Sequence, residues 1–247
     1  MKISAAACAA FILCACTEIP SGASAVASIQ FDSLPSPSVV LGDTLRDESG
    51  NVAPLAARAF AYGATGIVAP PFRYFTLDRG LTVDSVIGRV VGDSVRATAA
   101  RVVATVAGLQ AVMPIPVVFR PDTLAISGGR DSLAYSLTDS TGNISPSLSV
   151  VLRHTLTRTD SLVRSYLVKF AITNQTDTLA AQLVNDAGRA SSRDTTDLSG
   201  VASRKLRIRP TRLKSITDSV VVSASVTYRG AHVRGSPARL VLKVKPK

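Results

Sequence analysis

A short tripeptide recurs along most of this chain: an aspartate, then serine or threonine, then leucine or valine. Its copies are Asp32-Ser33-Leu34, Asp43-Thr44-Leu45, Asp84-Ser85-Val86, Asp93-Ser94-Val95, Asp122-Thr123-Leu124, Asp131-Ser132-Leu133, Asp160-Ser161-Leu162, Asp177-Thr178-Leu179 and Asp218-Ser219-Val220. An aspartate closes a turn by hydrogen-bonding to nearby backbone groups, and the apolar residue starts a strand. The repeat therefore predicts many short strands separated by turns, which is an all-β chain.

Alternation of apolar and polar residues supports the same fold class. One predicted strand places Val220, Val222, Ala224, Val226 and Tyr228 on a single face. The last strand has Leu240, Leu242 and Val244 on one face, opposite Arg239, Lys243 and Lys245. A period of two residues is that of a half-buried strand. Residues 96–108 are rich in alanine, but their valines and the lack of helix caps favour a strand there too.

The chain divides into two predicted units, residues 26–119 and residues 120–247. The predicted seam runs from residue 113 to residue 121, where Pro114, Pro116 and Pro121 stiffen the backbone. A new copy of the tripeptide follows at Asp122. Each unit has the length expected of a β-sandwich with seven to nine strands.

The amino terminus has the pattern of an export signal. Met1-Lys2 is followed by an apolar run over residues 3–15, which is too short to span a bilayer. Leu13-Cys14-Ala15-Cys16 resembles the lipobox of bacterial lipoproteins. That resemblance implies a signal peptide over 1–15, acylation of Cys16 and a flexible lipidated tether over 16–25. It places the protein outside the cytoplasm, anchored by lipid to a bacterial membrane, with the outer membrane favoured and either a periplasmic or a surface-exposed orientation. The alternative is an ordinary cleaved signal peptide with an incidental cysteine.

Cysteine chemistry is excluded from the mature chain. The three cysteines, Cys8, Cys14 and Cys16, all lie in the amino-terminal segment, and only the acylated Cys16 would remain after cleavage. We therefore expect no disulfide, no thiolate nucleophile and no cysteine-bound metal.

Several segments resemble bacterial immunoglobulin-like domains. In the first unit they are Leu41-Gly42-Asp43-Thr44-Leu45 and residues 55–60, 74–83, 88–92 and 103–110. In the second unit, Asn185-Asp186-Ala187-Gly188 and residues 194–202 are similar to the late turn of invasin- and intimin-type repeats. The chain departs from the pattern at 63–71 and 151–165. The resemblance implies two tandem immunoglobulin-like β-sandwiches with a structural or adhesive role.

Positive charge is concentrated at the carboxyl end. The net charge is +11, and residues 200–247 hold twelve Lys and Arg against one acid, Asp218. Lys205, Arg207 and Arg209 alternate along one predicted strand face, which makes them candidate contacts for an anionic surface such as phospholipid headgroups or an envelope polymer. The alternative is a solvated basic face without a partner. The export signal argues against nucleic acid.

Catalytic signals are weak. Gly92-Asp93-Ser94-Val95 resembles the nucleophile block of a lipolytic hydrolase family, but the chain lacks the Asp-x-x-His that such enzymes carry near the carboxyl end. We expect His154 and His232 to be surface residues, and Asp194 and Asp197 to cap turns in preference to binding calcium. No catalytic residue, metal site or cofactor is predicted.

These observations predict a membrane-anchored, non-enzymatic cell-envelope lipoprotein that acts as a spacer and as an adhesion or binding module. Its expected partners are the membrane, through the lipid, and another envelope protein or an anionic surface polymer. A scaffolding subunit of an envelope complex is the alternative, and a hydrolase is the third hypothesis.

Overall fold

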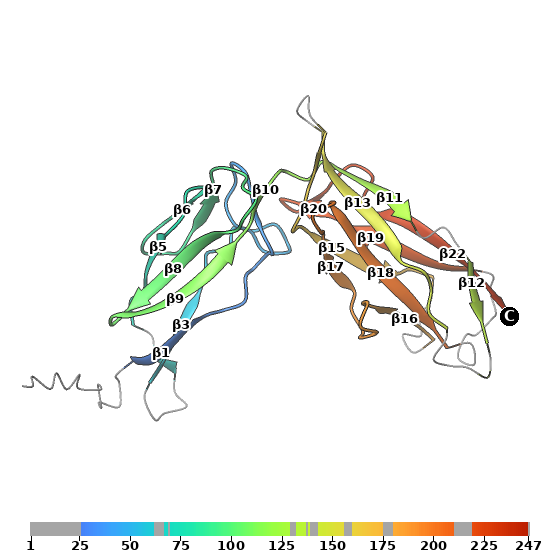
Figure 1. The fold of residues 1–247 in the computed structure, drawn as a ribbon, viewed down its shortest axis with the longest axis horizontal. Coiled ribbons are helices and arrows are strands. Elements are labelled where there is room, and N and C mark those ends of the chain that lie inside the picture. The colour runs from blue at the N-terminus through green and yellow to red at the C-terminus, as the bar shows by residue number, and fades with distance from the viewer. Residues whose placement is uncertain are drawn as a thin grey trace, which may run out of the picture.

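The computed structural model describes residues 26–61, 67–68, 70–128, 132–136, 138, 143–155, 160–174, 180–209 and 219–246. Within these ranges the chain forms strands, bridges and turns and no helix (Figure 1). The predicted all-β fold class is therefore confirmed. The predicted signal peptide, the tether and Cys16 lie outside the described residues.

The first unit is built from short strands. They are β1 (Val26–Phe31), β2 (Val39–Val40), β3 (Ala57–Ala61), β4 (Ile67–Val68), β5 (Arg73–Thr76), β6 (Leu81–Val83), β7 (Val90–Gly92), β8 (Ala100–Val106), β9 (Leu109–Ile115) and β10 (Val117–Val118). They form the sheets β1-β3-β4 and β5-β8-β9, the hairpin β6-β7 and the parallel pair β2-β10. The expected strand within 96–108 is β8.

The second unit has two larger sheets. Its strands are β11 (Thr123–Gly128), β12 (Ser132–Tyr135), β13 (Leu148–His154), β14 (Ser161–Leu162), β15 (Leu167–Ile172), β16 (Ala181–Val184), β17 (Arg193–Thr195), β18 (Val201–Ile208), β19 (Ser219–Ser225), β20 (Thr227–Tyr228), β21 (Ala231–His232) and β22 (Ala238–Pro246). One sheet has the order β11-β13-β18-β16, with β14 beside β13, and the other has the order β12-β22-β19-β15-β17.

The order of these strands is that of an immunoglobulin-like sandwich. In the second unit, β11, β13, β18 and β16 correspond to strands A, B, E and D of that fold. In the facing sheet, β22, β19 and β15 correspond to strands G, F and C. In both units an early short strand also pairs in parallel with the last one: β2 with β10, and β12 with β22. The chain therefore consists of tandem immunoglobulin-like β-sandwiches.

Period-2 alternation fills the core of each unit. In the second unit, the inward residues Leu148, Val150 and Leu152 of β13 are fully buried. They pack in the same cluster as inward residues of β19 and β22 from the facing sheet. The first unit has a smaller cluster that includes Phe31, Tyr74, Val102 and Ile115.

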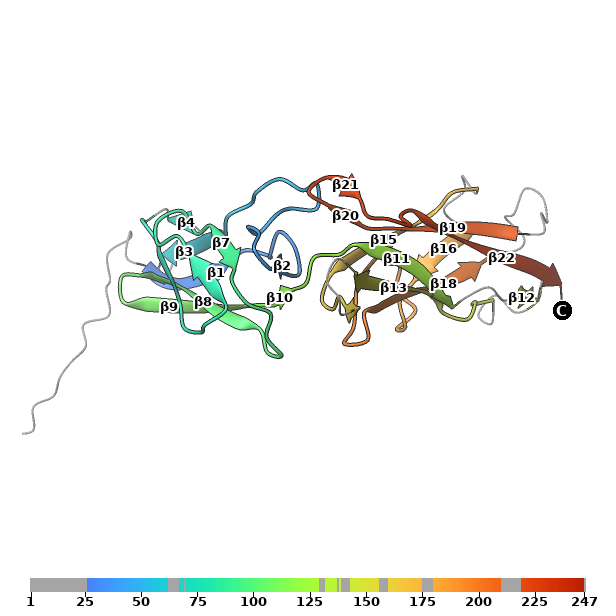
Figure 2. The same cartoon turned by 90° about the horizontal axis from the view of Figure 1, so that it is seen from above.

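The parallel pair β2-β10 belongs to both cores. Val39 and Val117 are register partners and lie in the cluster of the first unit, whereas their neighbours Val40 and Val118 lie in the cluster of the second. Since successive side chains of a strand point to opposite sides, two adjacent valines can serve two cores. The two units lie one after the other along the long axis, with this pair at their junction (Figures 1 and 2).

The predicted seam begins too early in the sequence. Residues 113–115 belong to β9, with Pro114 opposite Arg101, and β10 follows directly after Pro116. Ile115 and Val117 are buried in the first core. Pro114 is tolerated there because β9 is the edge strand of its sheet, where a missing amide donor costs little. The predicted boundary between residues 119 and 120 stays a prediction.

The repeated tripeptide starts strands only in the second unit. Its copies there enter β11, β12, β14 and β19, apart from the copy at 177–179, which lies outside the described residues. In the first unit, its copies follow a strand or form a turn. Asp84 shows the reason, because its carboxylate accepts the amides of Val86 and Ile87 and closes a turn before any strand begins.

Candidate functional site: the junction of the two units

The junction centres on Asp43, in the turn that follows β2. Gly42 enters the turn at a φ of +72°, and its amide donates to the carbonyl of Gly92. The Asp43 amide donates to the carbonyl of Val40, and its own carbonyl accepts from Gly92. The turn thus fixes Asp43 on the side facing the second unit, and the Asp43 side chain is only 4% exposed.

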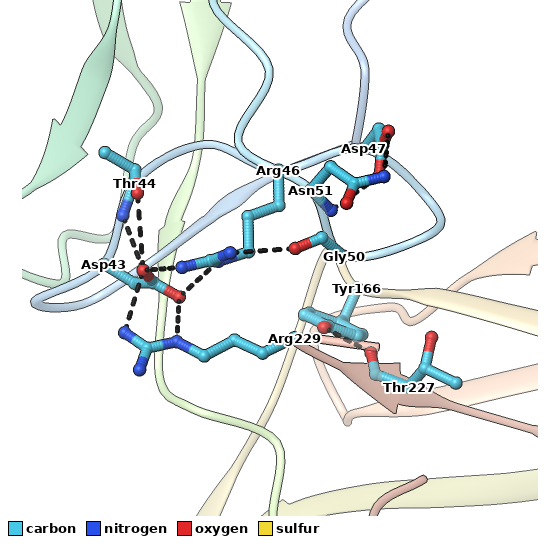
Figure 3. A network of polar contacts seen from close by, with 9 residues as sticks. All are labelled: Asp43, Thr44, Arg46, Asp47, Gly50, Asn51, Tyr166, Thr227 and Arg229. Atoms are coloured by element: carbon cyan, nitrogen blue, oxygen red, sulfur yellow. Dashed lines mark hydrogen bonds and ion pairs between the residues drawn. The ribbon is translucent and has the colours of Figure 1, made fainter. Parts of the chain in front are cut away.

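Two guanidinium groups, one from each unit, form ion pairs with the Asp43 carboxylate (Figure 3). Arg46 donates from Nε to Oδ2 at 2.9 Å and from Nη2 to Oδ1 at 3.0 Å. Arg229 donates from Nε to Oδ2 at 2.9 Å, and its Nη2 forms an ion pair with Oδ1, also at 2.9 Å. Such paired contacts fix orientation as well as distance, because a planar fork matches a planar carboxylate.

The electrostatics of this group favour the ionised carboxylate. Burial by itself raises the pKa of Asp43, but the hydrogen bonds from Arg46 and Arg229 outweigh burial. With further hydrogen bonds from Tyr228 and the Thr44 amide, they hold the pKa of Asp43 well below its usual range. The carboxylate is therefore charged at neutral pH, and its bonding capacity is used by the junction.

Arg229 reaches Asp43 from the hairpin between β20 and β21. Arg229 and Gly230 have φ values of +51° and +79°, as a two-residue type I′ turn requires. Arginine is an unfavourable residue at the first of these positions. At the base of the hairpin, the Tyr166 hydroxyl donates to the Thr227 carbonyl at 2.8 Å. Burial raises the pKa of Tyr166 above its usual range, so this phenol stays a donor.

Glu48 makes a second bridge between the units. Its carboxylate contacts Lys169 of β15 at 3.0 Å and Arg193 of β17 at 2.6 Å. The loop that carries Glu48 is held by Asp47, which accepts the amides of Ser49 and Asn51. The loop is therefore shaped within the first unit before it meets the second.

The two turns also touch through their backbones. A Cβ atom added to Gly50 would lie 2.2 Å from the Gly230 nitrogen. Figure 2 shows the β20–β21 hairpin reaching back to the loops of the first unit. Glycine is thus required at position 50 for the hairpin to approach this closely.

A small cavity of about 120 Å³ lies at the junction. Its lining includes Ser38, Glu48, Tyr166, Lys169 and Thr227. Ser38 is 4% exposed, and within the described part of the chain its hydroxyl has no hydrogen-bond partner. The site as a whole is a set of ion pairs that connect the two sandwiches.

Just past β10, the segment between the units is fixed by His154. This histidine stacks on Phe119 with ring centroids 5.4 Å apart, and its Nδ1 lies 2.7 Å from Asp122 Oδ2 and 2.9 Å from the Arg120 carbonyl. His154 is only 8% exposed, so the predicted surface position is wrong. It lies on the inward face of β13, where a buried carboxylate satisfies it.

The other predicted residues lie away from the junction. Lys205 forms an ion pair with Asp186 at 3.0 Å, and Arg207 donates to the Gly188 carbonyl at 3.1 Å; both are half-buried. Arg209 is exposed. Lys205 and Arg207 lie on one face of β18 and contact the turn at 185–189, and Arg209 follows the end of the strand.

The residues examined for catalysis and metal binding do not converge. Ser94 donates its amide to the Gly80 carbonyl in the first unit, and among the described residues no hydrogen bond joins it to either histidine. His232 is exposed. Asp197 accepts the amides of Ser199 and Val201, which confirms turn capping. Asp194 instead pairs with the buried Arg204 at 3.0 Å.

Within the same described ranges, no group of three or more His, Cys, Asp or Glu could hold a metal ion. That part of the chain also contains no helix with the length and apolar character needed to cross a bilayer.

Sequence reasoning missed Asp43, Glu48 and Arg229 as a group. The signals that mark their surroundings, Gly42-Asp43 and Arg229-Gly230, predict turns. No sequence pattern indicates that two turns so far apart along the chain contact each other.

Comparison with known proteins gives only distant structural likenesses. No family model matches the chain, and no curated protein matches its sequence. Domains 4 and 5 of the S-layer protein SbsC are 16% identical, with a TM-score of 0.30 over 89% of this chain and 98% of that one. Cadherin-like domains 1 to 4 of zebrafish RET are 13% identical, with a TM-score of 0.30 over 71% of this chain and 41% of that one. These scores are too low to assign a family or a function.

Proposed function

We propose that this chain is a non-enzymatic, membrane-anchored module of the bacterial cell envelope, a spacer that also presents an adhesion or binding surface. One observation supports it most directly: Asp43 and Glu48 of the first sandwich bind Arg229, Lys169 and Arg193 of the second. Ion pairs between tandem domains help to hold the domains at a fixed spacing, as a spacer requires.

The anchor in this proposal is Cys16, the last residue of the lipobox-like Leu13-Cys14-Ala15-Cys16. Several acyl chains on one residue give stable anchoring, because each buried methylene contributes roughly 0.8 kcal/mol and a single chain binds only marginally. The outer membrane is the proposed location, with the sandwiches on its periplasmic or its outer side.

The test of anchoring compares Cys16→Ser with Cys14→Ser. We expect the Cys16 variant to leave the membrane fraction or to remain unprocessed, and the Cys14 variant to behave like the wild type. Fractionation and mass spectrometry of the mature amino terminus provide the measurement. Unchanged processing and retention of the Cys16 variant would refute the anchor.

The proposed partners are an envelope protein or an anionic surface polymer. For a membrane surface of anionic lipid, Lys205, Arg207 and Arg209 stay the predicted contact. Vesicle binding of a Lys205→Ser, Arg207→Ser, Arg209→Ser variant, at low and high salt, tests that prediction.

A scaffolding role is the second candidate, and an apolar sheet face favours it. Phe75, Leu77 and Val112 are 38%, 51% and 52% exposed on the outer face of β5-β8-β9. Phe75 and Val112 flank Val103 in adjacent register positions. Exposed apolar patches mark interaction sites when residues cluster in this way.

Purification of the membrane-anchored protein with its partners separates the two roles. Leu77→Ser with Val112→Ser would release a scaffold partner, whereas Leu198→Ser, at an 80% exposed leucine of the second unit, would not. A spacer would show the same co-purifying proteins in all three samples.

A further inference from the structure

The outward face of β22 carries three exposed cations. Arg239, Lys243 and Lys245 alternate with the buried inward residues Leu240, Leu242 and Val244. Among the described residues, no carboxylate forms an ion pair with any of the three. We call these three cations the basic ridge.

Small residues flank the basic ridge on both sides. On β19, Ser219 and Ser223 are the register partners of Lys243 and Arg239. On β12, Ser132 and Ala134 are the register partners of Lys243 and Lys245. The long basic side chains are thus flanked by the short side chains of serine and alanine. None of these flanking positions carries an acid.

Four other basic residues of the second unit are already engaged within the protein. Lys205 and Arg207 contact the turn at 185–189, and Lys169 and Arg193 bind Glu48 at the junction. A positive group that already has a protein partner gains less from an external anion. The basic ridge is therefore better suited to an anionic partner than the predicted face of β18.

The spacing of the ridge favours a linear partner. Residues two apart on one strand face repeat about every 7 Å, so the three cations lie in a row about 20 Å long. A flat membrane would contact only the ends of the basic side chains on this one strand. A linear polymer can lie along the row and also contact the short side chains beside it. Charges of opposite sign along such a chain would complement the ridge.

Two further features of this face suit a sugar polymer. Val241 lies between Arg239 and Lys243 and is 47% exposed, so it offers apolar contact to the C–H face of a sugar ring. The Ser223 hydroxyl donates to the Ala171 carbonyl at 3.3 Å, and its oxygen can still accept a hydrogen bond from a sugar hydroxyl.

We infer that the outer face of β22 binds a linear acidic polysaccharide through Arg239, Lys243 and Lys245. The inference rests on the proposed function only in supposing that the face meets envelope polymers. Binding itself requires the face alone, so it can be measured whether or not Cys16 is acylated.

The test uses the full chain, purified in a neutral detergent. The probe is fluorescent polygalacturonate, a linear polymer with one carboxylate per sugar, and dextran is the neutral control. The ridge variant is Arg239→Ser, Lys243→Ser, Lys245→Ser. Its matched control, the β18 variant, is Lys205→Ser, Arg207→Ser, Arg209→Ser, which removes the same charge from β18 and the residue that follows it. Circular dichroism and thermal melting establish that both variants fold.

We expect the ridge variant to bind polygalacturonate at least about tenfold more weakly, since three exposed charge contacts of modest strength are lost. The β18 variant should stay within about threefold of the wild type, because two of its cations have partners in the protein. Binding should weaken with salt, because the Debye length falls from about 10 Å at 0.1 M to about 3 Å at 1 M.

Several results would overturn the inference. Equal loss in both variants would indicate net charge alone, and a larger loss in the β18 variant would place the contact at Lys205, Arg207 and Arg209. Binding that salt does not change, or equal binding to dextran, would remove the electrostatic basis. Binding to anionic vesicles without binding to polygalacturonate would assign the face to a membrane surface. Each outcome is independent of the Cys16→Ser fractionation that tests the anchor.

Discussion

The Arg229 guanidinium contacts both oxygens of the Asp43 carboxylate: Nε donates a hydrogen bond to Oδ2 at 2.9 Å, and Nη2 forms an ion pair with Oδ1 at 2.9 Å. The two residues are 186 positions apart in the sequence and belong to different sandwiches. Asp43 is 4% exposed, whereas Arg229 is 53% exposed, so water reaches the pair from one side only. The pair therefore acts as an orienting contact, and its net stabilisation is that of a partly screened ion pair.

Replacing Arg229 with serine should loosen the junction without unfolding either sandwich. The expected loss in free energy of unfolding is about 1 kcal/mol, because Arg229 is half exposed and Asp43 keeps Arg46. Arg229→Lys should recover only part of it, since an ammonium cannot make the paired contact. Spin labels on β8 and β22 would show a broader distance distribution in Arg229→Ser.

The matched control is Arg189→Ser, which removes an exposed arginine from the turn after β16. Its distance distribution should match the wild type. Identical distributions for Arg229→Ser and the wild type would mean that Val40, Val118 and Glu48 hold the units without this pair.

Acid should weaken the junction through Asp43. Because the pKa of Asp43 is lower in the folded protein than its usual value, folding favours the ionised form. That stabilisation is fully present above about pH 4, near the unfolded pKa, and is lost as the pH falls through the folded value. The difference in unfolding free energy between the wild type and Asp43→Asn, measured in urea, should therefore be largest at neutral pH and shrink below pH 4.

Asp78 offers a second site with the same sign. Hydrogen bonds from Arg101 hold the pKa of Asp78 at about 2, so its contribution should disappear between about pH 4 and pH 2. Asp78 lies on the first unit alone. Asp78→Asn should therefore leave the distance between the units unchanged, while Asp43→Asn broadens it. A difference between wild type and Asp43→Asn that stays constant with pH would contradict the account.

Much of the fold could be predicted because its causes are local. Alternation in β19 and β22 places apolar side chains on one face, and the structure buries those residues in one core. Even the charged Arg204, which the period assigns to the inward face of β18, lies inward and pairs with Asp194. Residues 113–115 of the predicted seam lie in β9 instead, because an edge strand accommodates Pro114.

The junction could not be predicted because its causes are distant in sequence. Asp43 and Arg229 each belong to a local turn that the residues explain, but their contact depends on how two sandwiches meet. His154 shows the same limit within one unit. Its burial depends on Asp122 and Phe119, which approach it only after β11 pairs with β13.

Replacing His154 with alanine should destabilise the second unit. The change leaves the buried Asp122 carboxylate without this neighbour and removes the ring that stacks on Phe119. The expected loss is about 2–3 kcal/mol in the free energy of unfolding, as for other broken buried polar pairs. His232→Ala, at an exposed histidine, should cost less than about 0.5 kcal/mol. Urea titrations that give equal values for both variants would show that the His154 contacts contribute little.

Replacing Gly50 with alanine tests how closely the two turns must approach. Gly50 has a φ of +91°, and an added Cβ would lie 2.2 Å from the Gly230 nitrogen and 2.6 Å from the Arg229 carbonyl carbon. Backbone atoms cannot rotate away as a flexible side chain can. The β20–β21 hairpin would therefore have to move, and Arg229 would be drawn away from Asp43.

Gly108→Ala is the matched control, since Gly108 has a φ of +80° and no atom within 4 Å of the added Cβ. Both variants cost about 1 kcal/mol for placing alanine at a positive φ, so their difference isolates the clash. We expect Gly50→Ala to lose at least about 1 kcal/mol more and to broaden the distance between the units, as Arg229→Ser does. If the two glycine variants instead had the same stability and the same distances, the contact between the turns would not constrain the junction.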